Sequence, residues 1–339
     1  MRLRPLGTTG LRVSEFCLGG VTLGTRWGFG ADEAESRRMV DVFRDAGGNF
    51  IDTAATYTEG QSESIIGTAV AGRRTEFVLA TKFAMHADAR DANSLGNHRR
   101  NLKLSLDGSL RRLRTDYVDL LWVHTWFFEN RLDQTVRALD DLVQAGKVLY
   151  WGLSDTPAWV CAQAETLARL RGWAPLSAVQ LEYSLAERTS DRELLPFADS
   201  AGVAVVGSKP LAGGLLTGKH HRPGTKPDTR RSAGADPRVE RVVRGLLTLA
   251  DKSGVAPTQL ALAWILHRHP SVIPVLGART ADQLIEGLGA ASAVVPDEVL
   301  DQLDEESAVP LGFPHELTAR ASMRAGMYGP FPPLPPVAP

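Results

Sequence analysis

Short apolar segments alternate with longer amphipathic segments from residue 17 to residue 290, and this alternation limits the possible folds more than any other feature. The apolar segments are nearly continuous, which is typical of strands that are buried on both faces of a parallel sheet. The segments between them have the 3.6-residue periodicity of helices. We expect strands at residues 17–20, 50–53, 77–82, 118–124, 148–154, 176–181, 203–207 and 271–277.

Each predicted strand is paired with a helix, and no linker interrupts residues 17–290. This pattern predicts an α/β fold in which residues 1–309 form a single (β/α)8 TIM barrel. A doubly wound sheet is the alternative, but it requires a glycine fingerprint after an early strand, which Gly19-Gly20 does not provide. We expect the first helix at 32–46, with a capping box formed by Asp32 and Glu35. Further helices are expected at about 62–71, 191–201, 238–252, 257–268, 281–288 and 297–306, around Leu102–Leu113, around Val136–Val143 and after Pro157.

Three segments lie outside the repeating units. Residues 3–16 contain two β-prone pieces around a Gly-bounded turn and are expected to form an N-terminal β-hairpin. The consecutive helices at 238–252 and 257–268 are two extra helices, and the polar chain before them, to about residue 237, is expected to be a mobile loop. Residues 310–339 are rich in proline and are expected to form an extended or partly disordered C-terminal tail.

The composition excludes several classes of partner. The 339 residues are 43% hydrophobic and 23% charged with a net charge of −1, which is typical of a soluble globular protein with no general attraction for nucleic acid. No apolar run is long enough to span a membrane and the N-terminus lacks the apolar core of a signal peptide, so we expect a cytoplasmic protein. Cys17 and Cys161 predict neither a disulfide nor a metal site, and the histidines at 220, 221, 267 and 269 are interpreted as solvated. The oligomeric state stays open.

Four polar residues lie at or just after the ends of three consecutive predicted strands. Asp52 ends the second strand and Tyr57 follows it, while Lys82 ends the third strand and His124 ends the fourth. In a barrel these residues would face the same mouth. Each one alone has a structural explanation, as a turn cap, a loop aromatic, a surface lysine or a core histidine. Their coincidence favours a catalytic group.

The sequence resembles the aldo-keto reductase superfamily, in particular its longer bacterial and potassium-channel-β-subunit-like branches, from about residue 3 to residue 305. The motifs that carry the resemblance are GGNFIDTAATYTEGQSE at 47–63, ATK at 80–82, VDLLWVH at 118–124, GKVLYWGLSD at 146–155, QLEYS at 180–184, PLAGGLLTGK at 210–219 and IPVLGARTADQL at 273–284. The resemblance implies a reductase that uses a nicotinamide cofactor and a small carbonyl substrate, with Asp52, Tyr57, Lys82 and His124 as its catalytic residues.

These residue types suit the reduction of a carbonyl group by hydride transfer, in which negative charge develops on the substrate oxygen. Tyr57 would donate a hydrogen bond to that oxygen and then a proton. We expect the Lys82 ammonium to lower the tyrosine pKa from its usual value of about 10, and Asp52 to keep the buried lysine charged. His124 would be the second donor, and no metal is required.

The resemblance also assigns residues that would bind the cofactor. It places Ser154, Asp155 and Gln180 at the carboxamide and residues 209–219 at the pyrophosphate, where glycines let backbone amides approach a phosphate. A glycine-rich turn alone is weak evidence. The assigned residues are Gly20, Val21, Asp52, Ser154, Asp155, Gln180, Ser208, Lys209, Pro210, Leu211, Gly213, Lys219, Gly277, Arg279, Gln283 and Glu286.

Arg279, Thr280 and the start of the next helix favour NADPH over NADH, because a guanidinium and helix amides can bind the 2′-phosphate. The alternative is that Arg279 pairs with Glu286 on the surface. The chain departs from the family pattern at a few positions of the cofactor site. Ser208 replaces an aromatic residue that stacks on the nicotinamide and Lys209 replaces a serine, while Asp155 and Gly287 each replace an asparagine.

Aromatic residues in the loops after the first, third and fourth strands are candidates to contact the substrate, with packing within the loops as the alternative. They suggest an apolar or aromatic substrate. Two other functions stay open, a redox-sensing subunit that binds the cofactor and a sugar-modifying reductase of a biosynthetic pathway. The candidates are Trp27, Phe29, Phe83, Trp126, Phe127 and Phe128.

Overall fold

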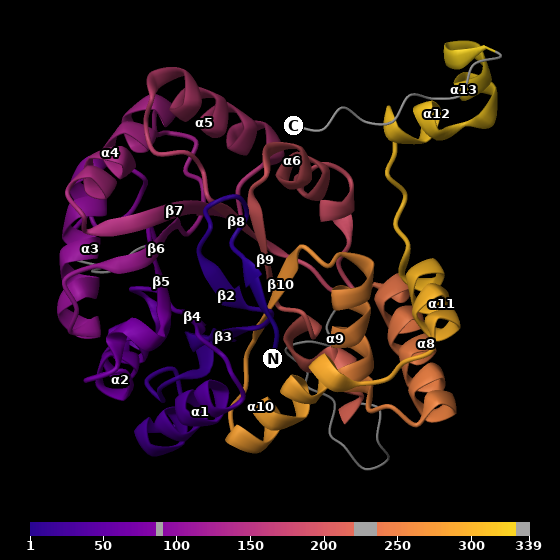
Figure 1. Cartoon of the computed structure of the whole chain (residues 1–339), viewed down its shortest axis with the longest axis horizontal. Coiled ribbons are helices and arrows are strands. Elements are labelled where there is room, and N and C mark those ends of the chain that lie inside the picture. Colours follow the sequence, from indigo (N-terminus) through magenta and orange to yellow (C-terminus); the bar gives the residue numbers. More distant parts are fainter. Residues whose placement is uncertain (86–90, 220–235, 330–339) are drawn as a thin grey trace.

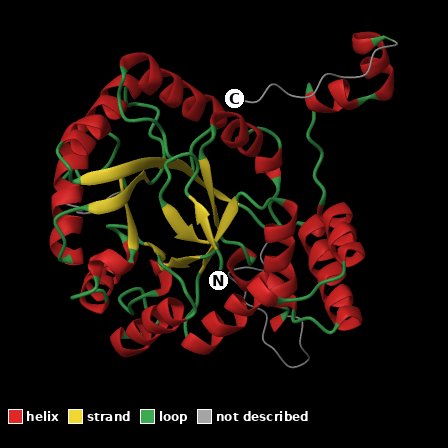
Figure 2. Cartoon of the chain, in the orientation of Figure 1, coloured by secondary structure: helices red, strands yellow, loops and turns green. Residues whose placement is uncertain are grey.

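The computed structural model describes residues 1–85, 91–219 and 236–329. In these residues eight parallel strands form a closed barrel in chain order, and the last strand pairs with the first (Figures 1 and 2). The predicted (β/α)8 barrel is therefore confirmed, and the open doubly wound sheet is excluded. The strands are β3 (Cys17–Gly19), β4 (Phe50–Asp52), β5 (Val78–Phe83), β6 (Val118–Val123), β7 (Val148–Ser154), β8 (Ala178–Glu182), β9 (Ala204–Ser208) and β10 (Val272–Leu276).

Helices surround this barrel, as Figure 1 shows, and two of them, α8 and α11, lie against each other at its side. The polar stretch that was expected to be a mobile loop lies mostly outside the described residues. The helices of the ring are α1 (Glu33–Asp45), α2 (Gln61–Ala69), α3 (Arg99–Leu113), α4 (Leu132–Gln144), α5 (Ala158–Arg171), α6 (Leu194–Ala201), α8 (Pro237–Ser253), α9 (Pro257–Arg268), α10 (Ala281–Leu288) and α11 (Asp297–Ser307).

The N-terminal hairpin closes the end of the barrel at which the strands begin. Its strands β1 (Leu3–Pro5) and β2 (Arg12–Ser14) pair antiparallel, as predicted. Leu6 and Val13 are fully buried against residues inside the barrel, including Phe50 of β4. Because this end is filled with apolar side chains, a ligand can approach the barrel interior only from the carboxyl ends of the strands.

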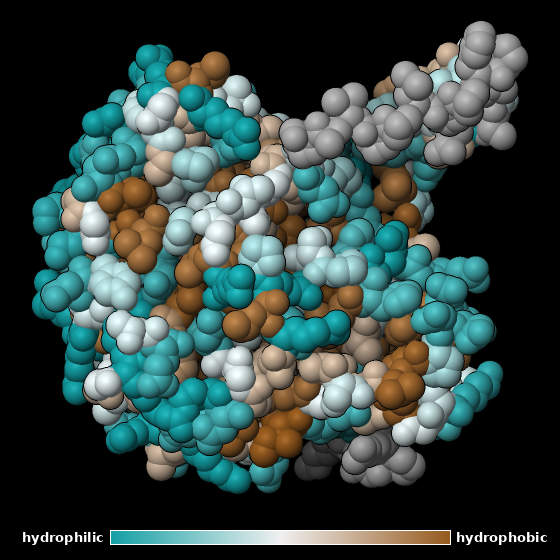
Figure 3. All heavy atoms as spheres, in the orientation of Figure 1, coloured by the Kyte–Doolittle hydropathy of each residue, from teal (hydrophilic) through white to brown (hydrophobic). Residues whose placement is uncertain are grey.

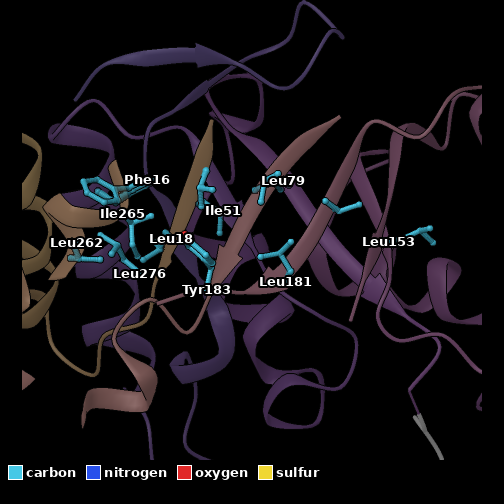
Figure 4. Packing of buried hydrophobic residues seen from close by; sticks show 14 of the residues in the cluster. Phe16, Leu18, Ile51, Leu79, Leu153, Leu181, Tyr183, Leu262, Ile265 and Leu276 are labelled. Carbon is cyan, nitrogen blue, oxygen red and sulfur yellow. The ribbon is translucent and has the colours of Figure 1, made fainter. Parts of the chain in front are cut away.

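Residues of each strand alternate between the barrel interior and the layer under the helices. In β4, Phe50 belongs to the interior cluster and Ile51 to the outer one. Figure 4 shows part of the outer layer, where Leu262 and Ile265 of α9 lie with Leu276 of β10. This alternation directs the last inward residue of each strand toward the open mouth.

Helix α1 begins at a cap that differs from the predicted capping box. The Asp32 carboxylate accepts a hydrogen bond from the Glu35 amide at 2.9 Å, as expected for an N-cap. The Glu35 carboxylate does not return to Asp32, but accepts a hydrogen bond of 2.6 Å from the Ala281 amide at the start of α10. Barrel closure brings these two helices together, so the side chain caps its neighbour instead of its own helix.

The described part of the C-terminal segment, residues 310–329, contains helices where an extended tail was expected, and residues 330–339 lie outside the described residues. Residues 310–314 lead to the short helices α12 (His315–Ala319) and α13 (Ala321–Tyr328), which project from the body of the molecule in Figure 1. Figure 3 shows that hydrophilic residues cover much of the same face, with separate hydrophobic patches between them. Within the described residues no helix is long and apolar enough to cross a membrane, and Cys17 and Cys161 are buried free thiols.

Candidate active site

Lys82 and Asp52 form a buried ion pair at the mouth of the barrel. They lie on the neighbouring strands β5 and β4, and their side chains are 0% and 3% exposed. The Lys82 ammonium donates hydrogen bonds to Asp52 Oδ2 and, at 3.0 Å, to the backbone oxygen of Thr53. Burial is the largest single influence and would lower the pKa of Lys82, but the charge of Asp52, the phenol of Tyr57 and the hydrogen bonds to both groups together raise it. The lysine is therefore an ammonium at every physiological pH.

Tyr57 is held over this pair by a constrained loop. It begins the short 3-10 helix η2 (Tyr57–Gly60), in which Thr58 and Glu59 have positive φ angles of 46° and 57°. The Thr58 hydroxyl fixes that conformation by donating to the backbone oxygen of Leu23 at 2.9 Å. As a result, the Tyr57 ring centroid lies 4.9 Å from the Lys82 ammonium nitrogen.

The pKa of Tyr57 is raised, which corrects the direction expected from the sequence. Burial of the phenol disfavours the phenolate and outweighs the opposing charge of Lys82. Tyr57 is consequently a neutral hydroxyl at physiological pH, the form in which it can give a proton. Lys82 limits the rise in pKa but does not reverse it.

His124 completes the group from the end of β6. Its ring centroid lies 5.7 Å from that of Tyr57, with the rings nearly perpendicular at 78°. Burial, together with the charge of Lys82, lowers the pKa of His124 to about 3, so the imidazole is neutral. Its Nδ1 is buried without a hydrogen-bond partner among the described residues. A neutral imidazole keeps one N–H that can be donated to a ligand.

A second group of polar atoms lies at the ends of β7 and β8. The Ser154 hydroxyl donates to Gln180 Oε1 at 3.5 Å, and the Asp155 amide donates to the Gln180 backbone oxygen at 3.1 Å. Gln180 Nε2 is buried and has no partner among the described residues. Because an unpaired buried donor is costly, this atom marks a place where a polar ligand group fits.

The chain after β9 turns through several left-handed residues. Ser208 is half-buried at the strand end, and the exposed Lys209 has a φ of 48° and forms an ion pair of 2.5 Å with Glu182. Pro210 and Leu211 lead into η5 (Ala212–Thr217), where Gly213 and Gly214 have φ angles of 64° and 97°. Such angles favour glycine and leave room for close approach of a ligand to the backbone. Lys219 is exposed at the end of this segment.

Residues 15–308 match the Aldo/keto reductase family. This chain belongs to the aldo-keto reductase family. An aryl-alcohol dehydrogenase of Pestalotiopsis microspora is 36% identical over 329 residues, which cover 93% of this chain and 84% of that protein. A norsolorinic acid reductase of Aspergillus flavus is 36% identical over 317 residues, covering 91% and 81%. A putative aryl-alcohol dehydrogenase of Saccharomyces cerevisiae is 33% identical over 335 residues, covering 93% and 89%.

Membership of this family makes the chain an oxidoreductase that acts on carbonyl or alcohol groups. Aldo-keto reductases use a nicotinamide cofactor, and the residues at the mouth fit such a molecule. The unpaired Gln180 Nε2 suits a carboxamide oxygen, and the glycine turn after β9 suits a phosphate. A Cβ placed on Gly277, at the end of β10, would meet nothing within 4 Å, so space is open there as well.

The start of α10, where the sequence predicts a phosphate site, has some of its backbone amides already paired. Two of the first helix amides are already bonded, that of Ala281 to Glu35 and that of Gln283 to the Thr280 hydroxyl at 3.3 Å. The Gln283 side chain accepts a hydrogen bond of 2.9 Å from the Arg279 amide. The side chain of Arg279 is exposed at this position.

Arg279 forms no ion pair with a carboxylate among the described residues. The alternative considered from the sequence, a surface ion pair between Arg279 and Glu286, is therefore absent. Glu286 is exposed on α10, and its backbone oxygen accepts a hydrogen bond of 3.1 Å from Gln259.

Two further residues assigned to the cofactor, Gly20 and Val21, begin the turn after β3, where Gly20 is buried and Val21 is exposed.

The substrate candidates do not all lie at the mouth. Trp27 is half-exposed, and its ring lies 6.4 Å from that of Tyr57. Phe83 follows Lys82 directly and so faces the other side of β5, where it is buried under the helices. Trp126 is buried, while Phe127 is half-buried and its amide donates to Asn97 at 2.7 Å.

One exposed aromatic residue at the rim of the barrel was not among the substrate candidates predicted from the sequence. Trp159 near the start of α5 is 56% exposed and stacks on Phe128, with ring centroids 6.4 Å apart. The sequence could have indicated Trp159, because it follows Ser154 at the end of a predicted strand by only a few residues. Residues just after a strand lie at the open end of the barrel. Glu182, the partner of Lys209, ends β8 and could have been found in the same way.

Proposed function

We propose that this chain is an NADPH-dependent aldo-keto reductase that reduces an apolar aldehyde or ketone, preferably an aromatic one, to the alcohol. The observation that carries the proposal is the convergence of the Tyr57 ring on the Lys82 ammonium and the His124 ring above a buried Asp52. The exposed aromatic residues at the rim and the names of the aryl-alcohol dehydrogenase relatives support an aromatic substrate.

In this mechanism, bound NADPH supplies the hydride. Tyr57 and His124 donate hydrogen bonds to the substrate oxygen, which lowers the cost of the negative charge that develops there. Tyr57 then gives its proton to that oxygen, and the fixed Lys82 charge stabilises the resulting phenolate. Asp52 holds the ammonium in place. Ser154 and Gln180 would orient the carboxamide of the cofactor.

The test is NADPH oxidation by the purified chain with matched sets of aromatic aldehydes, aliphatic aldehydes, ketones and sugars. We expect turnover, with the highest kcat/KM for aromatic aldehydes. Comparable rates for sugars would support the sugar-modifying alternative. Tight NADPH binding without turnover of any carbonyl would contradict the proposal and favour a cofactor-binding subunit.

A further inference from the structure

The loop of residues 24–30 connects the two ends of the candidate cofactor site. Its base is closed by hydrogen bonds of 2.8 Å from the Gly24 amide to Ala31 and from the Ala31 amide to Thr22. The Thr22 hydroxyl donates to the Ala278 backbone oxygen at 2.5 Å, one residue before Arg279. The loop is therefore anchored beside the position where the adenosine end would bind.

The same loop is also tied to the segment that carries Tyr57. The Gln61 side chain of α2 accepts hydrogen bonds of 2.9 and 3.2 Å from the amides of Thr25 and Arg26. Gly30 has a φ of 110°, and a Cβ there would come within 2.2 Å of the Gly24 backbone oxygen. The loop thus holds a defined shape between its two anchors.

Aromatic contacts run along this loop from the proton donor to the arginine. The Trp27 ring lies 6.4 Å from Tyr57 and 6.0 Å from Phe29. The Arg279 guanidinium carbon lies 5.5 Å from the centre of the Phe29 ring, within the range of a cation–π contact. Two parts of the site that are far apart in sequence are thereby joined through side chains of one loop.

We propose that Phe29 is a positioning residue that presents Arg279 to the 2′-phosphate of the cofactor. The inference rests on the proposed use of NADPH. Arginine has a long side chain that loses much conformational freedom when it binds, and a ring against the guanidinium removes part of that freedom in advance. A carboxylate partner would do the same but would compete with the phosphate. The phenyl ring restrains Arg279 and leaves its charge available.

The test uses fragments of the cofactor, so that it does not depend on catalysis. Binding of adenosine 2′,5′-bisphosphate and of adenosine 5′-monophosphate is measured by isothermal titration calorimetry on the full chain. We expect Phe29→Leu to weaken the bisphosphate about two- to fivefold, the range of an exposed cation–π contact, and to leave the monophosphate unchanged. Phe29→Tyr should restore the wild-type affinity.

Two variants are the controls. Trp159→Leu removes another exposed aromatic residue at the rim, one that stacks on Phe128, and should not change the ratio of the two affinities. In an Arg279→Ala background, Phe29→Leu should have no further effect on the bisphosphate. Equal weakening of both fragments, or no change in either, would overturn the role of Phe29. If the wild type does not prefer the bisphosphate, both the role of Phe29 and the choice of NADPH as cofactor are overturned. The proposed carbonyl reduction would not be overturned by that result, because NADH could supply the hydride.

Discussion

At the scale of single residues, the site depends on how burial and charge act on three ionisable groups. Burial favours the neutral forms of Tyr57 and His124, whereas Asp52 keeps Lys82 charged in the same place. The outcome is two neutral hydrogen-bond donors beside one fixed cation. That arrangement suits an oxygen that becomes negative during the reaction.

Replacing Tyr57 with phenylalanine should lower kcat for carbonyl reduction by ~10²–10⁴-fold, because the variant removes the proposed general acid and keeps the ring. NADPH affinity should stay close to that of the wild type. Steady-state rates and cofactor titration measure the two quantities. Turnover at the wild-type rate, with a primary isotope effect showing that hydride transfer limits it, would remove Tyr57 from this role.

The pH dependence should differ between the two directions of the reaction. Because the pKa of Tyr57 lies above its usual value, the phenol stays protonated and carbonyl reduction should be nearly constant between about pH 6 and pH 9. Alcohol oxidation needs the phenolate, so its rate should rise with pH over the same range. A decline in reduction near neutral pH would show that another group supplies the proton.

At the scale of elements, a polar cluster joins the loop after β8 to α9 and α11. Arg188 donates to Asp191 at 2.8 Å and to the Ser307 hydroxyl at 2.9 Å, and its guanidinium lies 5.1 Å from the Trp264 ring centre. His269 lies between the Tyr183 ring, at 5.6 Å, and Asp191, at 3.7 Å. The expectation that His269 is solvated was therefore wrong, because the end of α9 turns it into this cluster.

Asp191→Asn should destabilise the fold near neutral pH. Burial opposes ionisation of Asp191, but the neighbouring His269 and the hydrogen-bonded Arg188 lower its pKa to about 2. The difference from an unfolded pKa of about 3.9 corresponds to about 2 to 3 kcal/mol. A lowered folded pKa contributes stability above the unfolded pKa, and this contribution is lost as the pH falls from about 4 to about 2.

Chemical unfolding followed by circular dichroism across that pH range measures the effect. Asp282→Asn is a matched control, because Asp282 is in an exposed ion pair of 3.4 Å with Arg38, and it should change stability little. If the cost of Asp191→Asn were the same at pH 3 as at pH 7, the carboxylate charge would not be its cause.

At the scale of the whole molecule, the barrel and its C-terminal extension are held together weakly. The family match ends at residue 308, and α12 buries no residue. The contacts to the body include a hydrogen bond of 3.0 Å from Arg192 to the Phe313 backbone oxygen and a contact of 3.9 Å between His315 and Glu193, both exposed. Exposed polar contacts of this kind contribute little to stability.

A chain that ends at residue 309 should therefore fold to a barrel with nearly the same melting temperature and the same NADPH affinity. Thermal unfolding and cofactor titration of the shortened and full chains check this expectation. A well-folded truncated chain that has lost substrate selectivity would instead assign the extension a part in the active site.

The sequence by itself determined the barrel and the residues at its mouth, because both follow from local patterns. Nearly continuous apolar strands separated by amphipathic helices specify a parallel barrel, and the strand period of two directs Asp52 and Lys82 inward. The same period places Phe83 outside, a consequence that was available from the sequence and was overlooked.

Only the tertiary structure decided which distant groups meet. Glu35 bonds to the Ala281 amide and Phe29 lies against Arg279 because β10 pairs with β3 when the barrel closes. The direction in which the pKa of Tyr57 shifts also depended on tertiary structure. Burial of the phenol raises this pKa and the charge of Lys82 lowers it, and the folded chain sets which effect is larger. Local periodicity fixes the face on which a residue lies, but solvation and contacts across the barrel are set by all the segments that pack around it.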